Sequence, residues 1–182
     1  LAVQLRNLDA AIVGFLASPV VAGYYASASK LASPLRMLPT SLAVVVLPHA
    51  TRTREGSGKT IARLVLLAGT LVGLIYISLL LVVPWLVPMI LGFEYQDSIV
   101  PLQIVLMGLV FAAFTSLFGA VLQGRGFPGE VATASVATTI YLLVALLVLT
   151  PLGGAVGAAS ALATSFALEA VALAVFFVLK IL

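Results

Sequence analysis

The sequence has no cysteine and very few charged residues. The absence of cysteine excludes disulfides, thiolate metal ligands and a cysteine nucleophile. Charged residues make up only 8% of the 182 positions, against about 25% in ordinary soluble domains. His49 is the only histidine, so it has no second imidazole with which to hold a metal ion. We therefore expect neither a metal centre nor a cofactor.

Hydrophobic residues dominate what remains. They make up 63% of the chain, and the mean hydropathy is +1.26. A soluble protein of this size could not hide so much apolar surface, because its surface-to-volume ratio leaves much of the chain in contact with water. The net charge of +3 does not indicate a nucleic-acid partner, since no aromatic-basic pattern accompanies the basic residues. The sequence predicts an integral membrane protein whose partners include membrane lipids.

Apolar stretches alternate with short polar or Pro/Gly breaks. A transmembrane helix needs about 20 apolar residues, and helices satisfy their own backbone hydrogen bonds in lipid. We therefore predict an all-α fold with about six transmembrane helices in a single domain. The predicted helices are Ala2–Val20, Gly23–Pro48, Ile61–Leu91, Ile99–Leu122, Val131–Leu149 and Gly153–Leu179.

The loops differ in charge on the two predicted sides. One side carries the loop from Arg52 to Arg63, the Arg125 loop and Lys180. The other side carries Glu94 and Asp97 and no lysine or arginine. Basic residues concentrate on the cytoplasmic side of membrane proteins. Both ends of this segment are therefore predicted to be cytoplasmic, as an even number of helices requires.

The second predicted helix carries a polar face. Tyr25, Ser29, Ser33, Arg36 and Thr40 recur at helical spacing, with Lys30 at the edge of the same arc. Cations inside a membrane usually face a cavity or a partner. One interpretation is a cavity that binds an anionic substrate through Arg36, Lys30, Ser29, Ser33 and Thr40. The other is that Lys30 extends to the membrane surface while Arg36 only pairs with an acid.

The same helix contains Pro34 and Pro39. A proline has no backbone N–H, so the carbonyls of Lys30 and Leu35 lose their usual helical donors. We expect the helix to bend there. The bend is either a hinge of a transporter or an ordinary feature of a membrane helix.

Two acids lie inside apolar stretches. Asp9 is in the first, and Glu169 ends a stripe of small residues at intervals of four: Gly157, Ala161 and Ser165. Such stripes let helices approach closely, so Glu169 should face protein or a cavity. Both acids are candidates for ion coupling, for neutralising Arg36 or Lys30, or for a fixed structural ion pair. A similar stripe in the fourth helix, Gly108, Ala112, Thr115 and Gly119, is interpreted as packing.

Several short motifs resemble one protein family. They are Asn7-Leu8-Asp9, Gly23-Tyr24-Tyr25-Ala26-Ser27-Ala28, Leu38-Pro39, Leu47-Pro48-His49-Ala50-Thr51-Arg52, Gly92-Phe93-Glu94-Tyr95, Gln123-Gly124-Arg125-Gly126 and Pro151 through Ala159. In this order they resemble the C-terminal lobe of bacterial polysaccharide and O-antigen flippases. These belong to the multidrug/oligosaccharidyl-lipid/polysaccharide exporter superfamily.

The resemblance implies one lobe of a two-lobed transporter, with an N-terminal lobe as its partner. Its substrate would be an undecaprenyl-pyrophosphate-linked oligosaccharide, flipped across the bacterial cytoplasmic (inner) membrane by alternating access. The chain would then serve lipopolysaccharide or other polysaccharide biosynthesis, and it would not be an enzyme. The alternatives are a drug or cation exporter of the same superfamily, or a membrane-embedded enzyme acting on lipid-linked sugars. The outer loops offer such an enzyme only Glu94 and Asp97.

Overall fold

The computed structural model describes residues 9–52 and 58–182, and every element in these ranges is helical. Residues 2–8 of the first predicted helix, and 53–57 of the basic loop, lie outside the described ranges. The α-helices are α2 (Asp9–Leu16), α3 (Pro19–Ala32), α4 (Met37–Arg52), α5 (Gly58–Leu91), α6 (Ile99–Gly124) and α7 (Pro128–Ile181). In the same described ranges, two 3₁₀ turns, η2 (Pro34–Arg36) and η3 (Phe93–Ser98), connect some of these helices.

Local sequence explains where the helices begin and end. The Ser18 hydroxyl accepts the Val21 N–H at 3.4 Å, and Pro19 follows as the first helical residue of α3. Gly92 and Gly126 have φ angles of 93° and 91°, a region that favours glycine, and they lie directly after α5 and just after α6. The boundaries are therefore set by caps, prolines and glycines at the breaks between apolar stretches.

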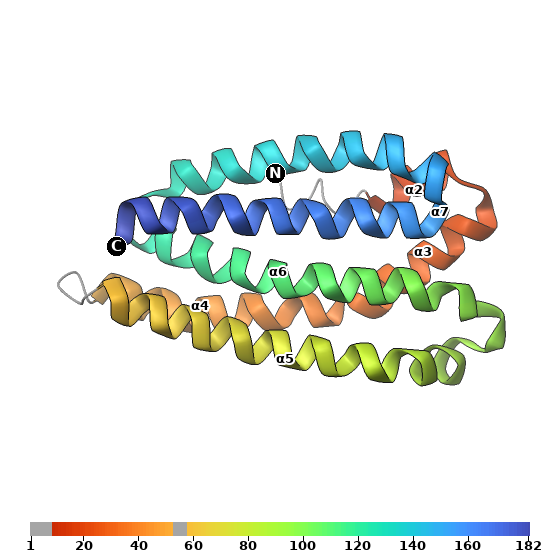
Figure 1. The fold of residues 1–182 in the computed structure, drawn as a ribbon, viewed down its shortest axis with the longest axis horizontal. Helices are drawn as coiled ribbons and strands as arrows, with labels where there is room; N and C mark the ends of the chain where they lie inside the picture. Colours follow the sequence, from red (N-terminus) through yellow and green to blue (C-terminus); the bar gives the residue numbers. More distant parts are fainter. Residues whose placement is uncertain (1–8, 53–57) are drawn as a thin grey trace.

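Helix α7 is a hairpin of two antiparallel arms. At Gly154 the backbone leaves helical geometry (φ 56°, ψ −134°), which separates an N-terminal arm (128–153) from a C-terminal arm (155–181). The Tyr141 hydroxyl lies 3.2 Å from Thr164 Oγ1, and Lys180 Nζ lies 3.8 Å from Glu130 Oε1. Figure 1 shows the two arms (cyan and dark blue) side by side along the bundle. The arms correspond to the two last predicted helices.

Helix α6 lies at the centre of the bundle and contacts α3, α4, α5 and α7 (Figure 1). Its buried leucines, including Leu106 and Leu109, belong to the main hydrophobic core. Two glycines permit close approach between helices. A Cβ at Gly108 would lie 2.9 Å from Ala163 Cα in α7, and a Cβ at Gly69 in α5 would overlap the Phe114 ring. Small residues thus set the packing of α6 against both neighbours.

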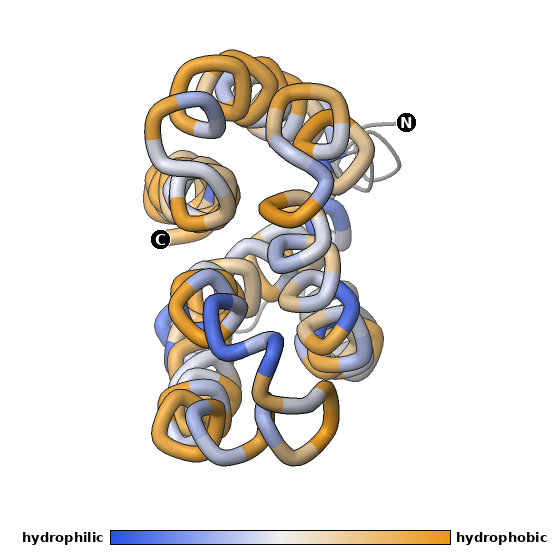
Figure 2. Tube along the Cα trace, turned by 90° about the vertical axis from the view of Figure 1, so that its right-hand side faces the viewer, coloured by the Kyte–Doolittle hydropathy of each residue, from blue (hydrophilic) through white to orange (hydrophobic). Residues whose placement is uncertain are grey.

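Within residues 9–52 and 58–182, three helices are long and apolar enough to cross a membrane: α5, the η3–α6 segment Phe93–Gly124, and α7. Many of their outer side chains are large and apolar; Trp85 is 80% exposed and Met89 88% exposed. Figure 2, which looks along the helices, shows hydrophobic residues prevailing along the chain, with only short hydrophilic stretches. This surface would be unstable in water, so the fold is compatible with a multi-pass all-α membrane protein.

The loops of opposite charge lie at opposite ends of the bundle (Figure 1). At one end Gly58 lies against the backbone of Ile181, and Lys180 pairs with Glu130. At the other end the rings of Tyr24 and Tyr95 contact each other edge to face. The basic residues Lys59, Arg125 and Lys180 are therefore gathered at the first end, and Glu94 and Asp97 at the second.

Candidate functional site

The rod formed by α3, η2 and α4 is interrupted at the two prolines. The α-helix stops at Ala32, a 3₁₀ turn covers Pro34–Arg36, and α4 starts at Met37. At the end of α3 the Ser33 N–H donates to the Lys30 carbonyl, and in the turn the Arg36 N–H donates to the Ser33 carbonyl, both at 3.2 Å. The interruption agrees with the bend expected from Pro34 and Pro39, and it puts Arg36 at the junction.

A cavity of about 470 Å³ lies beside this junction, between α4, α6 and both arms of α7. Its polar lining comes from all of these elements and from the end of η2: Arg36, Thr40, Thr115, Ser116, Gln123, Ser135 and Glu169. The rest of the lining is small or apolar and includes Val44, Leu109, Phe166 and Leu173. The cavity therefore combines an apolar wall with hydroxyl, amide, cationic and acidic groups.

Arg36 supplies the cation of the cavity. Its side chain is half-buried, and its Nη2 lies 3.5 Å from Ser29 Oγ, at the outer limit of a hydrogen bond. The Arg36 Nε is buried and has no hydrogen-bond partner among residues 9–52 and 58–182. A guanidinium carries five N–H donors in a planar fork, so Arg36 retains donor capacity for a planar or tetrahedral anion.

Glu169 supplies the acid. Its side chain is only 3% exposed, and its Oε1 accepts a hydrogen bond of 2.6 Å from the Ser135 hydroxyl on the other arm of α7. The residues of its stripe, Gly157, Ala161 and Ser165, are all buried. Glu169 thus faces protein and the cavity, as the stripe of small residues predicted.

Asp9 lies in a different environment. Its Oδ2 accepts a hydrogen bond of 2.8 Å from the Tyr25 hydroxyl, and its Oδ1 accepts the Ala10 N–H at 2.7 Å. Asp9 and Tyr25 are both buried between α2 and α3. In the part of the chain that the structure describes, no ion pair joins Arg36 or Lys30 to Asp9 or to Glu169.

The predicted polar face of the second helix is divided by the 3₁₀ turn. Arg36 and Thr40 line the cavity. Ser29 does not line it, although its hydroxyl contacts Arg36. Lys30 and Ser33 are exposed and do not line it. Lys30 is near the end of α3, and Ser33 lies at the break between α3 and the 3₁₀ turn, so neither belongs to the part of the rod that borders the cavity.

Four polar residues of the cavity were not predicted as a site. Thr115, Ser116 and Gln123 come from α6, and Ser135 comes from the N-terminal arm of α7. The stripe interpreted as packing in α6 has two roles, since Gly108 packs closely on Ala163 whereas Thr115 and its neighbours border open space. The sequence feature that could have indicated these cavity residues is the combination of small and hydroxyl side chains on that face of α6. Such a face can border a cavity as well as pack against another helix.

Comparison of the chain with protein-family models, with curated protein sequences and with solved structures gave no significant match. The function is therefore inferred from the cavity and from the surface around it. The decisive geometry is an arginine at a helix break, facing a partly apolar cavity inside a bundle with a lipid-compatible surface.

Proposed function

We propose that this chain is a six-helix lobe of a membrane transporter that flips an undecaprenyl-pyrophosphate-linked oligosaccharide. Five of the six proposed crossings are described: the α3–α4 rod, α5, α6 and the two arms of α7. The sixth is the first predicted helix, of which α2 is the described part. Helix α7 supports two crossings, because 54 residues of helix would extend roughly 80 Å, far beyond the ~30 Å of a bilayer core. A second, N-terminal lobe would complete the transport pathway.

The observation that carries the proposal is the Arg36 guanidinium at the cavity, with a buried Nε that has no partner within residues 9–52 and 58–182. Charge-assisted hydrogen bonds to phosphate are strong where water is scarce, and the planar fork suits two phosphate oxygens at once. The apolar lining, including Val44 and Leu173, is suited to an isoprenoid chain. The hydroxyl and amide groups of Thr115 and Gln123 suit sugar hydroxyls.

The basic end supports uptake from the cytoplasmic leaflet of the bacterial inner membrane. Gln123 lines the cavity, is exposed, and lies two residues before Arg125 in the basic turn. Under the positive-inside rule that turn is cytoplasmic. The substrate would therefore enter the cavity from the side on which such lipid-linked sugars would be loaded.

Arg36→Ala tests the proposal. The unaltered 182-residue chain in lipid nanodiscs should bind farnesyl pyrophosphate, a short lipid diphosphate, whereas farnesol should bind far more weakly. Arg36→Ala should lower the affinity for farnesyl pyrophosphate about ten- to a hundredfold, the loss expected for a hydrogen bond to a charged group. Binding is measured by equilibrium dialysis with radiolabelled ligand.

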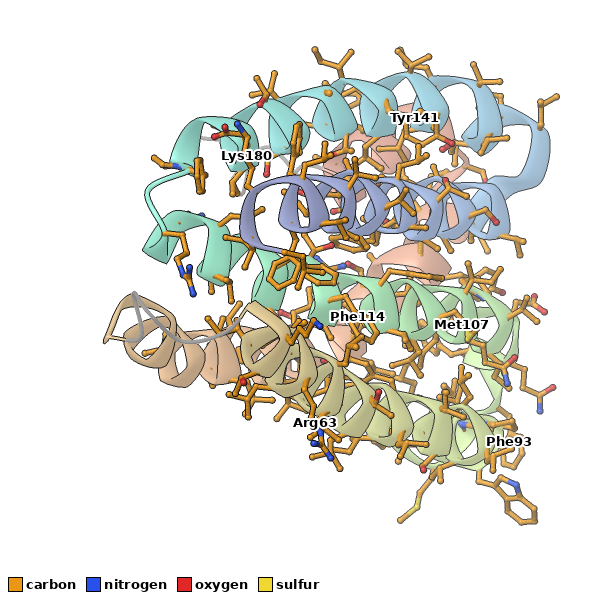
Figure 3. The ribbon with its side chains drawn as sticks, turned by 60° about the vertical axis from the view of Figure 1, so that its left-hand side comes forward. Arg63, Phe93, Met107, Phe114, Tyr141 and Lys180 are labelled. Atoms are coloured by element: carbon orange, nitrogen blue, oxygen red, sulfur yellow. The ribbon has the colours of Figure 1, made fainter. Side chains whose placement is uncertain are left out.

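Arg63→Ala is the matched control. Arg63 is an exposed residue of α5 that does not line this cavity, and Figure 3 shows its side chain pointing away from the bundle. Its replacement removes the same charge and should leave the affinity within about twofold. An equal loss of affinity in both variants would assign the binding to general charge attraction and contradict the proposal.

One observation favours a second candidate, a drug or cation exporter. Glu169 lines the same cavity and is buried, so it offers a negative partner to a lipophilic cation. Tetraphenylphosphonium distinguishes the candidates in the same nanodiscs. A cation exporter should bind it more weakly after Glu169→Gln and more tightly after Arg36→Ala, whereas the flippase proposal expects the diphosphate to be the preferred ligand.

A further inference from the structure

The two prolines of the α3–α4 rod release two backbone carbonyls, which are satisfied in different ways. The Lys30 carbonyl, released by Pro34, accepts the Ser33 N–H at the end of α3. The Leu35 carbonyl, released by Pro39, accepts a hydrogen bond of 2.7 Å from the Tyr76 hydroxyl of α5. The Met37 N–H is shared between the carbonyls of Pro34 and Leu35. Of these two released carbonyls, only that of Leu35 accepts a donor from another helix.

Tyr76 is well held for this contact. Its side chain is 0% exposed, and it lies near the middle of α5, far from either end of that helix. A carbonyl at this depth in a membrane has no bulk water as an alternative donor. Losing the tyrosine hydroxyl would therefore leave a backbone acceptor without a strong partner, which favours a different conformation of the turn.

The affected turn carries the proposed ligand-binding group. Arg36 follows Leu35 directly, ends the 3₁₀ turn and lines the cavity. A change in the backbone at Leu35 therefore moves the start of the Arg36 side chain. We propose that Tyr76 is a positioning residue, which fixes the 3₁₀ turn through the Leu35 carbonyl and so holds the Arg36 guanidinium at the cavity. This inference rests on the proposed anion-binding role of the cavity.

Tyr76→Phe removes the donor and keeps the ring. It should weaken farnesyl pyrophosphate binding about tenfold, because Arg36 is no longer held where its fork meets the diphosphate. Tyr141→Phe is the matched control. Its hydroxyl contacts Thr164 between the arms of α7, away from the cavity lining, and the affinity should stay within about twofold.

Pro39→Ala separates positioning from simple stabilisation. An alanine at position 39 restores the backbone N–H that the Leu35 carbonyl lacks, so the carbonyl no longer depends on Tyr76. In the Pro39→Ala background, adding Tyr76→Phe should change the affinity by less than about twofold. Hydrogen exchange supplies a readout without ligand. Tyr76→Phe should speed exchange of the amides from Arg36 to Leu38, and in the Pro39→Ala background it should not.

Two different failures can be told apart. If the unaltered chain does not bind farnesyl pyrophosphate, the proposed function fails, while the exchange measurement still tests the contact between Tyr76 and the turn. If the chain binds farnesyl pyrophosphate, two results would overturn the inference that Tyr76 positions Arg36. One is an unchanged affinity in Tyr76→Phe. The other is a loss of affinity on Tyr76→Phe that is equal with and without the Pro39→Ala substitution.

Discussion

Replacing Gly108 by alanine tests the packing of α6 against α7. A Cβ at this position would lie 2.9 Å from Ala163 Cα and 3.1 Å from its Cβ, and the nearest ring atom of Phe166 is at 3.5 Å. Because a backbone atom is the nearest neighbour, the clash cannot be relieved by turning a flexible side chain. One helix must move, and overpacking of this kind costs about 1–3 kcal/mol.

The matched substitution is Gly23→Ala. Gly23 is inside α3, and a Cβ there would meet nothing within 4 Å. Alanine stabilises a helix interior by about 1 kcal/mol relative to glycine, and this gain is common to both substitutions. The difference between the variants therefore isolates the packing penalty, so Gly108→Ala should be less stable than Gly23→Ala by about 1–3 kcal/mol.

The assay is reversible unfolding of the chain in mixed micelles with increasing dodecyl sulfate, followed by the fluorescence of Trp85, the single tryptophan. Far-UV circular dichroism provides a second probe of the same transition. Equal free energies of unfolding for the two variants would refute the close approach of Gly108 to Ala163 and with it the described register of α6 on α7.

Two further predictions concern the turns. Gly154→Ala should destabilise the chain by about 1–3 kcal/mol in the same unfolding assay, because its φ of 56° and ψ of −134° are accessible essentially to glycine alone; an unchanged free energy would contradict the described turn. The proposed orientation predicts that Gln96→Cys reacts with an impermeant maleimide in intact cells, whereas Lys59→Cys reacts only after permeabilisation. The native chain contains no cysteine, so each label reports one position, and the reverse pattern would invert the orientation.

Much of the fold could be predicted from the sequence because its signals are local. Apolar stretches give the helices, and the breaks at Gly92, Gly126 and the two prolines follow from backbone chemistry at single residues. The inward direction of Glu169 was also predictable, since a stripe of small residues indicates the face that meets other helices. Each of these inferences uses only residues close together in the chain.

The partners within the site could not be predicted in the same way. The stripe of small residues indicates that Glu169 points inward, but not that it meets Ser135, 34 positions away. Tyr76 and Leu35 are likewise 41 positions apart, and no pattern in the sequence pairs them. Such pairings depend on how the helices are arranged, a property that no short window of sequence contains. The periodicity likewise groups Lys30 and Ser33 with Arg36, yet both are exposed and do not line the cavity.

The turn between the arms of α7 has a consequence for biosynthesis. It consists of Pro151, Leu152, Gly153 and Gly154, with no charged side chain, whereas the opposite ends of the arms carry Glu130 and Lys180. The largest free-energy penalty in moving a loop through lipid is the dehydration of ionic groups. An uncharged turn does not incur this penalty. In the proposed orientation, the two arms enter the membrane together as one helical hairpin, with the charged ends left on the side of the ribosome.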